Sequence, residues 1–99
     1  MNIEETSFGI ISYAGDAFAT LRTAIQAARR KDYESSVVLM KEAQASILEA
    51  QRINKVLMEI PDINNQLSLL VIHAQDTLMN TVMFESIAEE LIEGYKERE

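Results

Sequence analysis

Apolar side chains recur every three or four residues along most of the chain, which is the spacing of amphipathic helices. The first such stripe contains Phe8, Ile11, Ala14, Phe18, Leu21, Ile25 and Ala28. It fades at the basic run Arg29-Arg30-Lys31. We therefore predict a first helix over about residues 4–30.

A second stripe contains Met40, Ala43, Ile47, Ala50, Ile53 and Leu57. Asp32 precedes it and is suited to cap a helix N-terminus. Pro61 ends it at or before Ile60, because the residue before a proline avoids the α conformation. The pattern predicts a second helix over about residues 33–59.

The third segment, predicted as a helix over about residues 66–96 with Asn64 or Asn65 as its cap, carries two apolar stripes. One contains Ile72, Met79, Met83 and Ile87, and the other contains Val71, Ala74, Leu78, Val82 and Ile92. Two sister helices cannot cover both stripes. We expect the second of them to face another copy of the chain.

Connections this short make neighbouring helices antiparallel. The expected fold is all-α, an up-down-up antiparallel three-helix bundle forming a single domain over residues 1–99. The hydrophobic content of 47% is high for 99 residues, which again favours association into an oligomer.

The composition excludes several classes of function. A net charge of −7 argues against nucleic acid as a partner, because phosphate binding needs clustered Lys and Arg. The chain has no cysteine, so it holds no disulfide or thiolate site. No apolar run approaches the ~20 residues that cross a bilayer, and the N-terminus lacks a signal core. We expect a soluble, cytoplasmic protein without direct membrane insertion.

The segment 69–79 holds the only histidine, His73, and Asp76 follows one helical turn later. Asp76 lies in line with Ile72 and Met79. It is either a partly exposed acid at the edge of that stripe or a carboxylate buried on an oligomer axis. In the second case the copies would repel one another unless they were protonated or shared a cation such as Mg²⁺.

A lone histidine is often only a packed or surface residue. It cannot form a zinc site or a hydrolytic triad without companions. The absence of a Gly-rich phosphate loop argues against a nucleotide cofactor. One reaction needs only an accessible neutral imidazole, namely accepting a phosphoryl group and passing it on. Gln75 points to the opposite side of the helix, so it would contribute mainly through a neighbouring subunit.

The run 68–79, with His73-Ala74-Gln75-Asp76 at its centre, resembles the IIA component of the lactose/cellobiose family of the bacterial phosphoenolpyruvate:sugar phosphotransferase system (PTS). Gly9-Ile10-Ile11 with Gly15-Asp16-Ala17 is similar to that family's first helix. Lys31-Asp32-Tyr33 resembles its first turn, which usually begins with glycine, and Met40 to Ala50 resembles its second helix. The likeness covers nearly the whole chain.

The resemblance implies a homotrimer, a nine-helix bundle. It implies that His73 accepts phosphate from the phosphocarrier HPr, through Nε2 (a tele-phosphohistidine), and passes it to a cysteine of a IIB component during uptake of lactose-, cellobiose- or chitobiose-type sugars. It places Asp76 at the trimer axis, sharing a divalent cation for which Mg²⁺ is expected. Gln75 becomes a supporting residue, and Leu70, Thr77 and Phe84 become the rim of the partner-binding surface.

Two departures from the family pattern keep an alternative open. Thr77 stands where many members have a second histidine, and Gln51 replaces another common histidine. The alternative is a non-catalytic helical module, related to the family, that regulates or binds other proteins.

Overall fold

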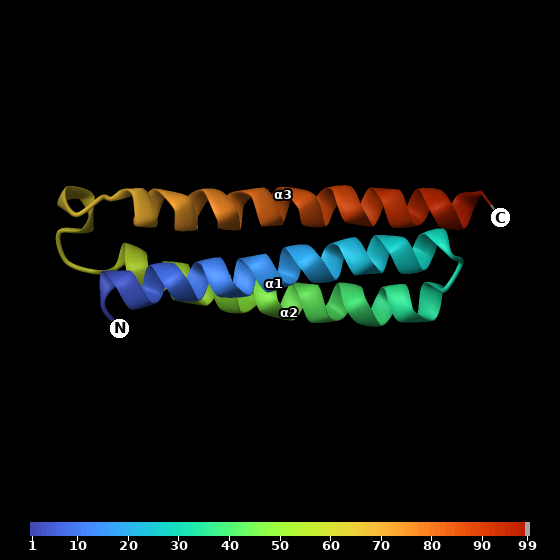
Figure 1. Cartoon of the computed structure of the whole chain (residues 1–99), viewed down its shortest axis with the longest axis horizontal. Helices are drawn as coiled ribbons and strands as arrows, with labels where there is room; N and C mark the ends of the chain where they lie inside the picture. The colour runs from blue at the N-terminus through green and yellow to red at the C-terminus, as the bar shows by residue number, and fades with distance from the viewer. Residues whose placement is uncertain (99) are drawn as a thin grey trace.

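The computed structural model describes residues 1–98 and consists of three long helices. These are α1 (Ile3–Arg29), α2 (Tyr33–Met58) and α3 (Leu69–Glu97), with a short 3₁₀ helix η1 (Ile63–Asn65) between the last two. Helices α1 and α3 run in one direction and α2 runs in the other, in a rod of 53 × 17 × 16 Å (Figure 1). The predicted up-down-up arrangement of an all-α bundle is confirmed.

Helix α1 is the shared support of the protomer. It packs along α2 and along α3, whereas α2 and α3 touch each other at few places. Small side chains make this close packing possible, since the fully buried positions of α1 include Ala14, Ala17, Ala24, Ala27 and Ala28. A side chain added at Gly9 would come within 3.3 Å of Ile53 on α2. The alanines of α1 therefore let the other helices approach closely, and Ile10 and Leu21 of α1 fill the core beside them.

The N-terminus of α2 was predicted correctly, and that of α3 was not. The Asp32 carboxylate accepts a hydrogen bond of 3.2 Å from the Ser35 amide. Hydrogen bonding with the Ser35 side chain, and then with its amide, lowers the pKa of Asp32. Neither Asn64 nor Asn65 caps α3, because both belong to η1. Instead the Ser68 hydroxyl accepts from the Val71 amide at 3.3 Å, so α3 begins at Leu69 and not at 66.

The predicted core face of the first helix is partly wrong. Phe8 remains 54% exposed and Phe18 39% exposed, although both belong to the stripe predicted to be buried. The buried face of α1 is centred instead on Ile10, Ala14, Ala17 and Leu21. The two phenylalanines lie at the edge of that face, and a pattern of spacing alone does not separate edge from centre.

The turn between α1 and α2 holds a strained residue. Lys31 has a φ of 66°, and the amides of Lys31 and Asp32 donate to the carbonyls of Ala28 and Ala27, which is a Schellman ending. A left-handed backbone at that place favours glycine.

We expect Lys31→Gly to raise the free energy of unfolding by about 1 kcal/mol, because glycine removes the clash of a Cβ in the left-handed region. Chemical denaturation at equal protomer concentration measures this. Arg30→Gly is the matched control, since Arg30 has a φ of −83° and offers no strain to relieve. An equal gain from both substitutions would contradict the account.

Candidate functional site

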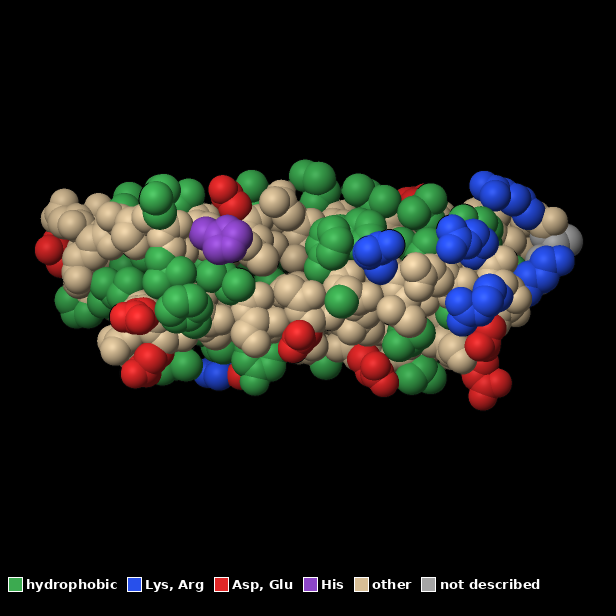
Figure 2. Space-filling view, in the orientation of Figure 1, with side chains coloured by type: hydrophobic (Ala, Val, Ile, Leu, Met, Phe, Trp, Pro, Cys, Tyr) green, Lys and Arg blue, Asp and Glu red, His purple; other side chains and the backbone are tan. Residues whose placement is uncertain are grey.

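His73 lies on the second turn of α3, with its imidazole exposed to solvent. Figure 2 shows the single histidine at the surface where α3 borders α1. Within residues 1–98, no hydrogen bond or ion pair engages its ring, and this includes the carboxylate of Asp76 one turn away. The ring nitrogens are therefore open to an incoming molecule.

The backbone of His73, in contrast, is tied to the core by two hydroxyl groups. Thr77 Oγ1 donates to the carbonyl of His73 at 2.7 Å. The buried Thr81 Oγ1 lies 2.8 Å from the carbonyl of Thr77 and 3.3 Å from the carbonyl of Ala14 on α1. Thr77 thus lies at the predicted rim, and its hydroxyl braces the turn that carries the histidine.

Apolar side chains border the open imidazole on one side. Leu70 and Phe84, the other two predicted rim residues, are both half-buried on α3. The Phe84 ring stacks on Phe18 of α1 with centroids 4.4 Å apart. The contacts of Thr81 with Ala14 and of Phe84 with Phe18 set the register of the two parallel helices. That register places the exposed Phe8 level with the turn of His73, and Figure 2 shows hydrophobic side chains below the histidine.

The structure separates the two stripes of α3. Val71, Ala74, Leu78 and Ile92 are buried against the other helices. Ile72, Met79, Met83 and Ile87 are 47–60% exposed and form what we call the outer stripe. Asp76 is exposed within this outer stripe. One stripe is thus left without a partner, and it is the first of the two. The prediction that the second stripe faces another copy is wrong, because that stripe is buried within the protomer.

The outer stripe offers one acid per protomer at Asp76. Across residues 1–98, no group of three or more His, Cys, Asp or Glu side chains is placed to hold a metal ion. The carboxylate of Asp76 has the hard oxygen donors that Mg²⁺ prefers. A metal site here therefore requires Asp76 from several copies of the chain.

Gln75 has a partner that the sequence did not predict. Its Nε2 lies 2.6 Å from Oδ1 of Asn54, across the boundary between α3 and α2. This contact lies within one protomer and on the side of α3 away from His73. Gln75 thus fixes α3 against α2, where direct contacts are few. Nothing in the spacing of residues 54 and 75 points to such a long-range pair.

No helix within residues 1–98 has the length and apolar content that spanning a membrane requires. The candidate site is thus an exposed histidine on a braced helical turn, bordered by apolar side chains of α1 and α3. This arrangement is suited to contact with another macromolecule, because it is a surface and not an enclosed cavity.

Several known proteins are similar to this chain over nearly its full length. It is 35% identical over 101 aligned residues to the lactose-specific EIIA component of the PTS of Streptococcus mutans, covering 97% of each chain. It is 35% identical to the lactose-specific EIIA component of Lactococcus lactis, covering 97% of this chain and 96% of the relative.

Solved structures show the same fold. The cellobiose-specific enzyme IIA of Bacillus anthracis matches with a TM-score of 0.88 and 29% identity, over 98% of this chain and 91% of that one. The IIA(Chitobiose) component of Escherichia coli, solved in complex with HPr, matches with a TM-score of 0.86 and 25% identity, over 98% and 96% of the two chains. The family model of the PTS lactose/cellobiose-specific IIA subunit matches residues 5–96, and the chain therefore belongs to this family of phosphotransferase components.

Proposed function

We propose that this protein carries a phosphoryl group on His73, accepting it from phosphorylated HPr and passing it to a cysteine of a IIB component during sugar uptake. The observation that carries the proposal is the exposed imidazole without a partner, on a turn held by Thr77. Support for HPr as donor comes from the solved E. coli relative, which is a IIA(Chitobiose)–HPr complex. The sugar is of the lactose, cellobiose or chitobiose type, and the transfer takes place in the cytoplasm.

The proposed reaction requires little from this chain beyond holding the His73 ring in position. In the proposed step, Nε2 of His73 attacks the phosphorus in line as the P–N bond of the donor histidine breaks. The donor ring takes up a proton and the His73 ring releases one, so the proton count is unchanged. Phosphoryl transfer depends mainly on positioning and charge stabilisation. The bracing of His73 by Thr77 supplies position, and the partner supplies the remaining polar groups.

The apolar surface around His73 is the proposed docking site for both partners. It comprises the predicted rim, Leu70, Thr77 and Phe84, together with Phe8 and Phe18 of α1. An apolar patch encircling one reactive side chain lets partners bind without competing for the ring itself.

The experiment that tests the function is phosphorylation in a reconstituted system. The protein is incubated with phosphoenolpyruvate, enzyme I and HPr, and its intact mass is measured. A gain of one phosphoryl group per protomer, lost when HPr is omitted, is expected. No gain with active HPr would overturn the proposal and leave the alternative, a non-catalytic regulatory module.

A homotrimer, a nine-helix bundle around the outer stripes of three copies, completes the proposal. It would cover Ile72, Met79, Met83 and Ile87, which a single protomer leaves exposed. Asp76 of each copy would then lie near the axis and hold a divalent cation, with Mg²⁺ the best match to carboxylate oxygens. The cation would neutralise the three acids.

We expect Asp76→Leu to leave a stable trimer, because leucine removes the repulsion between like charges and continues the apolar stripe. Sedimentation at a series of concentrations, with and without a chelator, measures this. The native trimer should weaken when the chelator is added, and the variant should not. Monomers in both proteins would contradict the axial position of Asp76.

A further inference from the structure

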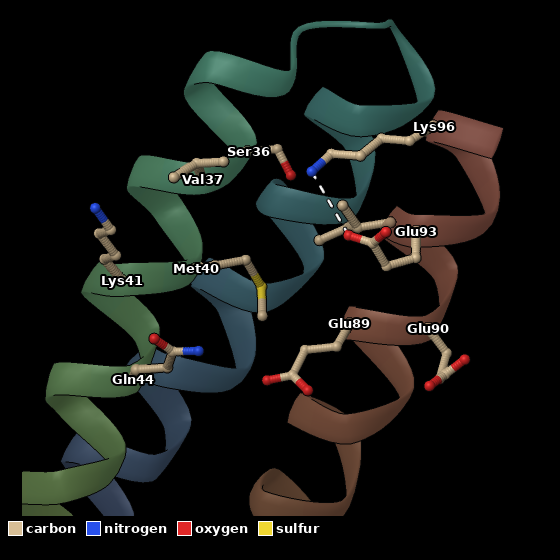
Figure 3. Close-up of a pocket in the computed structure, with 10 residues that line it drawn as sticks. Ser36, Val37, Met40, Lys41, Gln44, Glu89, Glu90, Glu93 and Lys96 are labelled. Carbon is tan, nitrogen blue, oxygen red and sulfur yellow. Dashed lines mark ion pairs between the residues drawn. The ribbon is translucent and has the colours of Figure 1, made fainter. Parts of the chain in front are cut away.

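A cavity of about 450 Å³ lies between α2 and α3, far from His73 along the rod. Its walls include Ser36 and Met40 of α2 and Ile92 of α3, together with three acids, Glu89, Glu90 and Glu93, and two cations, Lys41 and Lys96 (Figure 3). Helices α2 and α3 touch at few places, so the space is open toward solvent on the flank of the protomer. We call this space the acidic pocket.

Several polar groups of the acidic pocket make no hydrogen bond or ion pair within residues 1–98. Ser36 and Glu89 are two of them, and Lys41 and Glu90 are others. The hydroxyl of Ser36 is fully buried and makes no hydrogen bond within residues 1–98. Figure 3 shows it directed into the space between the helices, and shows Glu89 reaching from α3 toward Met40 and Gln44. Glu93 pairs with Lys96 at 3.6 Å, whereas Glu89 has no ion pair in the described part of the chain. The exposed, unpaired Glu89 carboxylate beside apolar carbons suits a cation on an aliphatic stem.

The opposite flank of the same protomer carries such a cation. Phe18 on α1 stacks on Phe84, so Arg22, one turn later, lies on the edge of α1 that borders α3. Arg22 is exposed and makes no ion pair within residues 1–98. Figure 2 shows Lys and Arg side chains gathered on this face over the C-terminal halves of α1 and α3.

Arg22 and Glu89 lie at the same height along the long axis of the protomer. The contacts Ala14–Thr81 and Phe18–Phe84 place residue 22 of α1 level with residues 88–89 of α3. In a cyclic assembly whose axis is parallel to the helices, each protomer offers one flank to its neighbour's other flank, and levels are preserved. Arg22 of one copy would therefore stand opposite Glu89 of the next.

The geometry points to Arg22 of a neighbouring copy as the occupant of the acidic pocket. Its methylene stem would lie along Met40, and its guanidinium would donate to the Glu89 carboxylate. This inference rests on the proposed homotrimer and extends it, because it names a charged contact between subunits. A water-excluded Arg–carboxylate contact also fixes the register of the subunits.

The test is charge reversal at both ends of the contact. Arg22→Glu and Glu89→Arg, made singly, are each expected to raise the dissociation constant of the trimer by roughly tenfold or more. The double variant Arg22→Glu/Glu89→Arg should recover most of the loss. The matched control is Arg52→Glu, which has the same change in charge on an exposed side chain that pairs with Glu49 of its own helix. Sedimentation at low and high salt gives the readout, and circular dichroism checks that each variant is folded.

The outcomes separate this inference from the proposed function. A native protein that stays monomeric at every concentration would defeat the trimer, and this inference with it. A native trimer in which Arg22→Glu behaves like Arg52→Glu would defeat the Arg22 contact alone. A weaker trimer in both single variants, with no recovery of trimer stability in the double variant, would also overturn the pairing of Arg22 with Glu89. Phosphorylation of His73 is assayed separately.

Discussion

Replacing His73 by alanine is expected to abolish phosphorylation by phospho-HPr, because the chain has one histidine and no cysteine to take its place. The imidazole is exposed and makes no hydrogen bond or ion pair in the described residues, so its loss should not unfold the helix. Intact mass after incubation with phosphoenolpyruvate, enzyme I and HPr measures the result. Circular dichroism should match that of the native protein.

Asn80→Ala provides the control for this substitution. Asn80 is exposed two turns further along the same side of α3, and it has no nucleophilic group. We expect the Asn80→Ala variant to accept one phosphoryl group per protomer. An equal gain of mass in His73→Ala and native protein would show that another side chain is the acceptor. Binding of a partner protein that is unchanged by His73→Gln, in a chain that never gains mass, would favour the regulatory alternative.

The second large effect is expected from a charge on the outer stripe. Met83 is 60% exposed in one protomer and would be buried among copies of the chain at the trimer axis. Met83→Glu removes apolar contact worth about 2 kcal/mol per protomer and brings three carboxylates together. We expect monomers at concentrations where the native protein is a trimer. Sedimentation measures the assembly, and circular dichroism tests whether the helices persist.

Val38→Glu is the matched control for Met83→Glu. Val38 is 51% exposed on α2. Met40 lines the acidic pocket facing α3, and Val38, two residues away, points to the opposite side of α2. The added charge is the same, but no subunit contact is expected there. Dissociation by both variants would indicate a general effect of charge, and assembly of Met83→Glu like the native protein would place the interface elsewhere.

Much of the fold was predictable because its signals are local. Asp32 caps α2 as expected, and α2 ends at Met58, before Pro61, which is a restriction between neighbouring residues. The presence of two apolar stripes on α3 also followed from spacing alone, but which of them is buried within the protomer did not. The cap of α3 was missed because Asp62 turns the chain into η1 with a φ of 62°, which delays the helix to Ser68.

The relative positions of the candidate site residues on α3 were predictable, and their surroundings were less so. His73, Asp76 and the rim lie on one helix, so periodicity places them relative to one another. Phe8 was assigned to the core, and only the register between α1 and α3 shows it level with His73. The Gln75–Asn54 contact and the acidic pocket join residues far apart in sequence. Contacts of that kind depend on the tertiary arrangement and cannot be predicted from the spacing of apolar positions.

The role of α1 as a shared support has a consequence for the order in which this chain folds. Helices α1 and α2 are joined by a short turn and pack on each other along their length, so their contacts link residues close in sequence and this hairpin can form early. Helix α3 has few contacts with α2 and packs mainly on α1, so we expect it to add to the hairpin of α1 and α2. The segment that bears His73 is then expected to become ordered after the other two helices.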